Sequence, residues 1–250
     1  MFLEDILSDL PRMLLMLPAV LLSLSVHEAA HGYAAYKLGD PTAKNLGRLT
    51  LNPIKHINPI GFLSMVIFHV GWANPVPINA RYFKNPRKGM AITAAAGPIS
   101  NLCLAFIFTV LLRVLMIPTS SMMTDAFLAG DYSLDSLFTN PAFVIMAVLA
   151  IILYFGIILN INLMLFNLIP LPPLDGSRIA YIFLPTNVYF KIMKYERYIM
   201  LGFILLLATT NIISEPLATL NGYISDFLFS ITEIPSFDFY YLIAVFFSRF

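Results

Sequence analysis

Two histidines four residues apart are the side chains in this sequence best placed to do chemistry together. They occur in the segment His27-Glu28-Ala29-Ala30-His31. Residues four apart on a helix share one face, so both imidazoles can reach a single metal ion. Glu28 projects beside them, and its carboxylate would be free to take a proton from a water bound to that metal. The pattern therefore predicts a zinc site with Glu28 as its general base.

This segment lies inside an apolar run that is long enough to cross a membrane. The chain has 250 residues, of which 59% are hydrophobic and 12% are charged. Such a composition is too apolar for an ordinary soluble domain. Ionisable side chains are costly in lipid and usually serve a function there. The alternative is two histidines that only pack in a buried helix, and the cluster of three ionisable groups disfavours it.

Four runs are apolar enough to span the bilayer. They cover about residues 13–36, 90–117, 142–167 and 198–213, of which the last is short unless it is tilted. Between the first two runs, short apolar pieces alternate with Asn-Pro pairs and glycines, which predicts strands, with Leu49-Thr50-Leu51 as an edge strand. We therefore expect an all-α multi-pass membrane protein with about four to six transmembrane helices and a small membrane-associated β region.

The whole chain, residues 1–250, is expected to form a single membrane-embedded domain. Its core covers about residues 13–213. Residues 214–250 form a C-terminal tail with an amphipathic first half and an aromatic second half.

Lysine and arginine are distributed unevenly among the segments that join the spans. The basic residues after the first span are Lys37, Lys44, Arg48, Lys55, Arg81, Lys84, Arg87 and Lys88, and those after the third are Arg178, Lys191, Lys194 and Arg197. The segment between the second and third spans carries Asp125, Asp131 and Asp135 and no basic residue. The positive-inside rule then places that segment and the N-terminus outside, and the metal site toward the cytoplasmic side. We interpret the basic clusters as topology signals and lipid headgroup contacts, because no nucleic-acid-binding motif is present.

A catalytic zinc ion usually takes three protein ligands and one water, so the two histidines need a partner. Cys103 is the only cysteine, which leaves histidine and carboxylate side chains. Asp175 is the strongest candidate, because the prolines at 170, 172 and 173 break the preceding helix. Irregular backbone at membrane depth is tolerated only where protein or a wet cavity surrounds it. His56, His69 and Glu196 remain weaker candidates, and a turn at the interface remains an alternative role for Asp175.

Together these motifs resemble the site-2 protease family of intramembrane zinc metalloproteases. The resemblance rests on the histidine segment in one span, on Ala96-Gly97-Pro98-Ile99-Ser100-Asn101 in the next, and on the stretch from Asn167 to Gly176. It covers about Leu21 to Leu207 and is nearest to the compact bacterial members that lack PDZ and CBS domains. Gly47-Arg48-Leu49-Thr50-Leu51-Asn52-Pro53 and Ala73-Asn74-Pro75-Val76-Pro77-Ile78-Asn79 support it.

The resemblance implies a role for particular residues. One zinc ion would be held by His27, His31 and Asp175, with Glu28 as the base and later the proton donor to the leaving amine. Asn167 would engage the substrate near the scissile carbonyl. Asn101 is a second candidate substrate contact, with a polar tether between helices as its alternative role.

The expected function is hydrolysis of peptide bonds within or next to transmembrane helices of other proteins in the cell membrane. The expected partners are a transmembrane protein substrate and the lipid bilayer, with the oligomeric state left open. A metal-ion transporter or sensor is one alternative, because intramembrane histidine and aspartate also line ion pathways. The second and fourth spans offer no such residues, which disfavours it. A noncatalytic relative that only binds membrane helices is another alternative, and the intact Glu28 disfavours that one.

Overall fold

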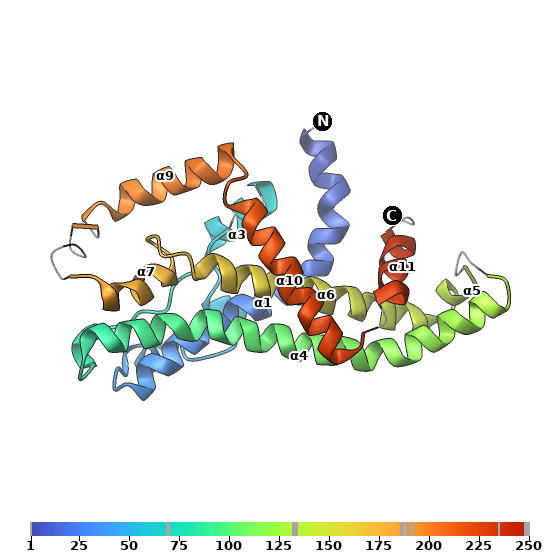
Figure 1. The fold of residues 1–250 in the computed structure, drawn as a ribbon, viewed down its shortest axis with the longest axis horizontal. Coiled ribbons are helices and arrows are strands. Elements are labelled where there is room, and N and C mark those ends of the chain that lie inside the picture. The colour runs from blue at the N-terminus through green and yellow to red at the C-terminus, as the bar shows by residue number, and fades with distance from the viewer. Residues whose placement is uncertain are drawn as a thin grey trace. The chain divides into compact units, whose positions relative to one another are not determined.

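The computed structural model is mostly helical and describes residues 2–68, 71–131, 135–185, 188, 191–192, 194–234 and 236–247 (Figure 1). The chain divides into two compact units. The first consists of Met1–Val20, Leu104–Leu159 and Tyr223–Phe250, and the second of Leu21–Cys103 and Asn160–Gly222. All the predicted site residues that the structure describes belong to the second unit. The expectation of a single domain over residues 1–250 stays a prediction.

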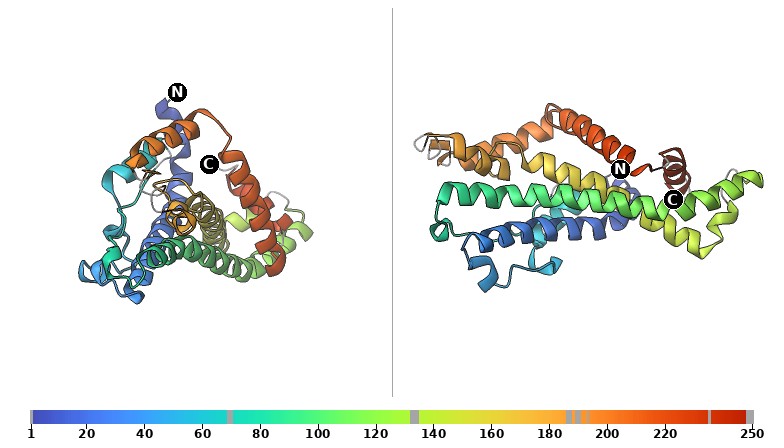
Figure 2. Two further views of the ribbon diagram at one scale, coloured as in Figure 1. Left: turned by 60° about the vertical axis from the view of Figure 1, so that its left-hand side comes forward. Right: turned by 60° about the horizontal axis from the view of Figure 1, so that its bottom comes forward.

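Three helices among the described residues are long and apolar enough to cross a membrane. They are α1 (Phe2–Lys37), whose candidate span is Met13–Lys37, α4 (Pro86–Leu128) and α6 (Pro141–Asn167). A helix needs about 20 residues to cross the hydrocarbon core, and the candidate spans have 25, 43 and 27. The chain is therefore a membrane protein, and the first three predicted spans are confirmed as apolar helices of spanning length. Within the second unit, the parts of α1, α4 and α6 that belong to it lie side by side (Figure 2).

The fourth predicted span, at 198–213, is not among these helices. It falls on α9 (Glu196–Thr209), which has 14 residues and is therefore about 21 Å long at 1.5 Å per residue. The backbone leaves the helix at Thr210, which is extended, and the Thr210 hydroxyl donates to the Leu206 carbonyl at 2.8 Å. The polar residues at 209–211 thus end the helix before it reaches spanning length. The described residues contain three candidate spans rather than the four to six expected.

The remaining helices are short or lie in the C-terminal tail. They are α2 (Thr42–Asn45), η1 (Pro53–Lys55), α3 (Pro59–Phe68), η2 (Ala80–Tyr82), α5 (Asp135–Phe138), α7 (Asp175–Ala180), η3 (Tyr181–Phe183), α10 (Ser214–Thr232) and α11 (Ser236–Phe247). The predicted tail is thus occupied by the helices α10 and α11.

The predicted small β region between the first two spans is wrong. In the part of this segment that the structure describes, β pairing is limited to one antiparallel bridge between Ile57 and Ala73. Asparagine side chains use the backbone amides for turns instead, because Asn52 Oδ1 accepts from the Ile54 N–H at 3.1 Å and Asn58 Oδ1 from the Gly61 N–H at 3.0 Å. The prolines of the Asn-Pro pairs also bring no donor to a ladder. The expected edge strand Leu49-Thr50-Leu51 is therefore not formed.

Side chains, rather than a sheet, fix the segment 74–79 that follows α3. Arg48 Nη2 donates to the Asn74 carbonyl at 2.7 Å, and the Val76 N–H donates to Glu28 Oε2 at 2.8 Å. The Asn79 N–H donates to Asp40 Oδ2 at 2.6 Å. Asp40 is fully buried just after α1, and its other oxygen accepts from the amide and the hydroxyl of Thr42. The segment 74–79 is thus held by Arg48 and Asp40 at its two ends and by Glu28 of α1 between them.

Replacing Asp40 with alanine should loosen the segment 74–79. The change removes the acceptor of two buried or partly buried amides, which should lower the free energy of unfolding by about 1–3 kcal/mol. Thermal unfolding in detergent would measure this effect, with the exposed Asp125→Ala as a matched control that should stay within about 0.5 kcal/mol of the parent. Equal melting temperatures for the two variants would contradict the role given to Asp40.

Candidate metal centre

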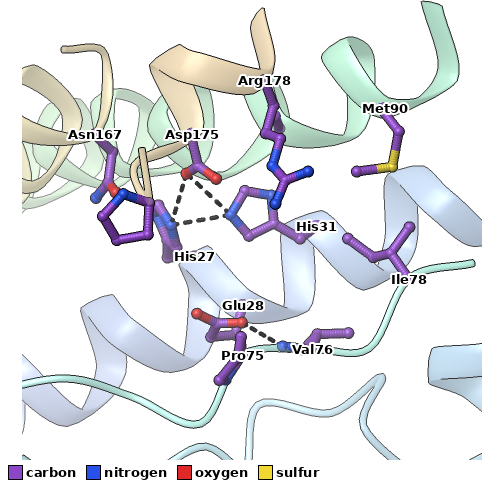
Figure 3. A pocket seen from close by; sticks show the side chains of 12 residues that line it. His27, Glu28, His31, Pro75, Val76, Ile78, Met90, Asn167, Asp175 and Arg178 are labelled. Atoms are coloured by element: carbon purple, nitrogen blue, oxygen red, sulfur yellow. Dashed lines mark hydrogen bonds and ion pairs between the residues drawn. The ribbon is translucent and has the colours of Figure 1, made fainter. Parts of the chain in front are cut away.

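Three predicted ligand residues converge at one point of the second unit. His27 and His31 lie one turn apart on α1, and Asp175 is the first residue of α7. The two imidazole Nε2 atoms are 3.0 Å apart, and each lies 3.2 Å from Asp175 Oδ2 (Figure 3). Among the described residues, this is the group of His, Cys, Asp and Glu side chains whose ligand atoms lie close enough to hold one ion. The structure thus brings Asp175 to two histidines that lie 144 and 148 residues before it in the sequence.

The turn after α6 places the Asp175 carboxylate. Helix α6 ends at Asn167, and α7 starts at Asp175 after an extended residue at Leu174. Gly176 makes this tight return possible, because a Cβ at that position would lie 2.3 Å from the Leu168 carbonyl oxygen. The sequence Asp-Gly therefore lets the start of α7 pack against the end of α6.

Helix α4 holds the outer nitrogen of each imidazole. His27 Nδ1 lies 2.6 Å from Asn101 Oδ1, and His31 Nδ1 lies 2.7 Å from the Thr93 carbonyl oxygen. Because both oxygens accept hydrogen bonds, each Nδ1 must donate, and in a neutral ring the Nε2 atom then carries a lone pair. Such partners fix the tautomer and the orientation of metal-binding histidines.

The inner face of the cluster requires a positive charge. Two Nε2 lone pairs and one carboxylate oxygen face one another at 3.0–3.2 Å, and the buried Asp175 Oδ2 has no hydrogen-bond partner among the described residues while both rings are in this tautomer. A proton on either ring or a metal cation can supply that charge. Ligand atoms around a tetrahedral zinc ion with bonds of about 2.0–2.2 Å lie about 3.3–3.6 Å apart, slightly farther than the 3.0–3.2 Å here, and two imidazoles with one carboxylate are a common catalytic zinc set. The residues present therefore fit zinc.

Asp175 is ionised at neutral pH. Burial by itself would raise the pKa of this carboxyl group, but hydrogen bonds and charge from His27 and His31 in their protonated form outweigh burial and lower the pKa to about 2. An ionised carboxylate is the form that coordinates a metal.

Glu28 borders the same cavity but does not join the cluster. The cavity holds about 350 Å³ and is bordered by the three cluster residues, Glu28 and Asn167, together with apolar side chains of α4 and of the segment 74–79. Figure 3 shows the Glu28 carboxylate turned toward Pro75 and Val76, where Oε2 accepts the Val76 N–H at 2.8 Å. The amide thereby orients a carboxylate that lies beside His27 and His31 on the same helix.

The two predicted substrate contacts occupy different places. Asn167 lines the cavity, and its Nδ2 donates one hydrogen bond to the Leu163 carbonyl of its own helix at 2.9 Å. Asn101 is fully buried behind His27 and is not among the residues that line the cavity. Its amide is engaged by His27 on one side and by Asn160 on the other. The structure therefore brings Asn167, but not Asn101, to the cavity.

The weaker ligand candidates lie outside the cluster. His56 is buried and its Nε2 lies 2.8 Å from the Thr50 carbonyl oxygen. Glu196 is 4.0 Å from Arg178 Nη2. His69 falls outside the described residues.

Sequence reasoning missed two residues near the centre. Arg178 lines the cavity one turn after Asp175. Asn160 contacts Asn101 at 2.7 Å and is fully buried. A signal for Asn160 was present, because it is a polar residue in an apolar span and lies seven residues, or two helical turns, before Asn167 on about the same face.

Comparison with known proteins gives a consistent result. The family described as "Peptidase family M50" matches residues 15–209. A Bacillus subtilis protein with the printed name "Putative zinc metalloprotease YwhC" is 43% identical over 208 residues, which cover 83% of this chain and 85% of that protein. "Putative zinc metalloprotease Rip2" of Mycolicibacterium smegmatis is 27% identical over 167 residues, which cover 65% of this chain and 54% of that protein. No solved structure is a match for this chain.

Gly97 on α4 provides a direct test of the packing at the cluster. A Cβ at this position would lie 2.5 Å from His31 Nε2 and 2.6 Å from His27 Cε1, so Gly97→Ala must displace the rings or the helix. We expect zinc affinity to fall by about 10- to 100-fold, as for other changes that misorient ligands. Competition with a chelator would measure it, and Gly202→Ala, where a Cβ meets open space, is the matched control. Unchanged zinc affinity in Gly97→Ala would contradict this arrangement of the two rings.

Proposed function

This chain belongs to peptidase family M50, the site-2 protease family, and we propose on that premise that it cuts peptide bonds within or next to transmembrane helices. It is a zinc metalloprotease of that family, and its substrates are therefore proteins. The observation that carries the proposal is the convergence of His27, His31 and Asp175 beside Glu28 in a membrane protein. Cleavage inside the bilayer is the natural use of a hydrolytic site on an apolar helix of spanning length.

We assign one zinc ion to the two histidines and Asp175. The donor set, the short distances between the three ligand atoms and the Nδ1 partners on α4 support this assignment. When bound, zinc supplies a Lewis acid that polarises the scissile carbonyl and lowers the pKa of a bound water to about 7.

Glu28 is assigned the proton transfers. Its carboxylate would accept a proton from the attacking water and then return it to the leaving amine. Two features support the role: Glu28 borders the cavity that also exposes the ligands, and the Val76 N–H holds one of its oxygens in place. A fixed carboxylate loses less freedom at the moment of reaction than a mobile one.

Asn167 is assigned a contact with the scissile carbonyl. An amide nitrogen carries two hydrogens, and one of them is used for the Leu163 carbonyl. The second can donate to the charge that develops on the carbonyl oxygen, an interaction often worth a few kcal/mol in related sites. The position of Asn167 on the cavity wall supports this role.

The substrate is proposed to bind in an extended conformation along the segment 74–79. A helix keeps its peptide groups in internal hydrogen bonds, so the bond to be cut must first leave the helix. Pro75, Val76 and Ile78 of this segment border the cavity, which places backbone next to the reacting groups. Pairing of an extended peptide with exposed backbone is a common mode of peptide recognition.

The orientation in the cell membrane follows from charge. Basic residues cluster after the first and third spans, and the segment after the second span is acidic. By the positive-inside rule, the active site faces the cytoplasmic side and the N-terminus lies outside.

Replacing Glu28 with glutamine tests the base directly. Glutamine has the same shape but cannot take a proton, so cleavage of a membrane-embedded peptide should fall by about 10²- to 10⁴-fold. Because Glu28 is not a ligand in this proposal, zinc content should match that of the parent protein. Full activity at equal zinc content would reject Glu28 as the base.

Replacing Asp175 with asparagine tests the third ligand. The change removes the anionic donor, and zinc affinity measured by chelator competition should fall by more than about tenfold. Asp226→Asn, at an exposed position on α10, is the matched control and should bind zinc like the parent. The ligand assignment fails if Asp175→Asn retains the zinc affinity of the control.

A further inference from the structure

A chain of buried polar side chains leads away from His27. His27 Nδ1 lies 2.6 Å from Asn101 Oδ1, Asn101 Nδ2 donates to Asn160 Oδ1 at 2.7 Å, and Asn160 Nδ2 donates to Ser23 Oγ at 2.8 Å. The three residues behind His27 come from α1, α4 and α6, and each has an exposed fraction of 0%. We call Ser23, Asn160 and Asn101 the polar relay.

The polar relay has no access to substrate. None of its members is among the residues that line the cavity at the metal centre. A buried amide that loses a partner costs about 1–3 kcal/mol, and the same helices could be packed with apolar side chains at no such cost. A role in holding a reactive group explains its presence better than packing alone.

The two imidazoles of the centre are oriented by different means. His31 Nδ1 faces the Thr93 carbonyl, a backbone oxygen of helix α4 that cannot rotate. His27 Nδ1 faces a side-chain amide, which presents either an oxygen or an NH₂ group depending on how it is turned. The position of the proton on His27 therefore depends on a further group that fixes the orientation of the Asn101 amide.

Asn160 fixes that orientation in this structure. Its Oδ1 accepts a hydrogen bond from Asn101 Nδ2, which leaves Asn101 Oδ1 facing His27. If the amide were turned over, an N–H would face Nδ1, and the neutral ring would have to carry its proton on Nε2. That proton would point at His31 and Asp175 and block the lone pair that a metal requires.

We propose that Asn101 and Asn160 are positioning residues for the metal centre, anchored by Ser23. They keep His27 in the tautomer with a proton on Nδ1 and a lone pair on Nε2. This inference rests on the proposed role of His27 as a zinc ligand. It gives Asn101 a role other than the substrate contact that the sequence suggested.

The first test replaces Asn160 with leucine, which has a similar shape but no acceptor for Asn101. Zinc affinity of the full-length protein, measured by chelator competition, should fall by about 10-fold or more. The matched control is Asn162→Leu on the same helix, which removes a 2.8 Å hydrogen bond of the same kind to Asn221. It should bind zinc within about twofold of the parent, because it shares no partner with His27.

A second readout does not depend on zinc. In the metal-free protein, ¹⁵N NMR of labelled histidine distinguishes the two tautomers. The parent and Asn162→Leu should show His27 with the proton on Nδ1, whereas Asn160→Leu should show a mixture. Ser23→Ala is a milder variant in case Asn160→Leu does not fold, and it should weaken zinc binding by about 3- to 10-fold.

Asn101→Asp separates positioning from general packing. A carboxylate can only accept from His27 Nδ1, and its second oxygen can accept from Asn160 Nδ2 once that amide turns over, so the zinc affinity should be retained. Adding Asn160→Leu to this variant should then have little further effect on zinc. An equal loss of affinity from Asn160→Leu in both backgrounds would show a structural role only and overturn the proposal.

Two outcomes distinguish this inference from the site itself. If His27→Ala loses zinc while Asn160→Leu and Ser23→Ala bind it like the parent, the positioning role is wrong and the zinc site stands. If His27→Ala binds zinc like the parent, the ligand assignment on which the proposal rests is wrong.

Discussion

Three electron-pair donors that face one another in an apolar protein impose the main constraint on this fold. The Nε2 atoms of His27 and His31 and the Oδ2 atom of Asp175 are 3.0–3.2 Å apart. Such an arrangement is stable only when a positive charge lies among them, because lone pairs at this distance repel and desolvation removes the screening that water provides. A proton on either ring or a divalent cation can supply that charge, and the zinc ion that we propose would also be the reactive group. The same three atoms thus require a positive charge among them and would hold the metal ion of a metalloprotease.

Close packing at two glycines and several hydrogen bonds keep these atoms together. Gly97 lets α4 approach both imidazoles, and Gly176 lets α7 return to the end of α6. The Thr93 carbonyl and the Asn101 amide direct the rings from behind. On the opposite side, Val76 orients Glu28 through its backbone amide. The glycines therefore allow close packing, Gly97 against the imidazoles and Gly176 against backbone. The polar contacts fix the direction in which the lone pairs point.

The sequence predicted the parts of this arrangement that depend on local patterns. The i, i+4 spacing of His27 and His31, the apolar runs of α1, α4 and α6, and the proline break before Asp175 are all local signals. The predictions from the sequence failed where side chains bind backbone groups. Asn52 and Asn58 accept hydrogen bonds from amides that a strand would need, and Thr210 ends α9 before the helix is long enough to span a membrane. The contact of Asn160 with Asn101 joins residues 59 apart and depends on helix packing that no local pattern encodes. The pairing of Asp175 with the histidines was predictable from the proline break, from the small number of other ligand types and from the resemblance to the family.

X-ray absorption at the zinc edge of the purified full-length protein tests the central claim most directly. We expect bound zinc with two imidazole nitrogens and only nitrogen or oxygen donors, and a change in the first coordination shell in Asp175→Asn. Zinc that is absent from the folded protein, or whose coordination shell is the same in the parent and in Asp175→Asn, would contradict the account.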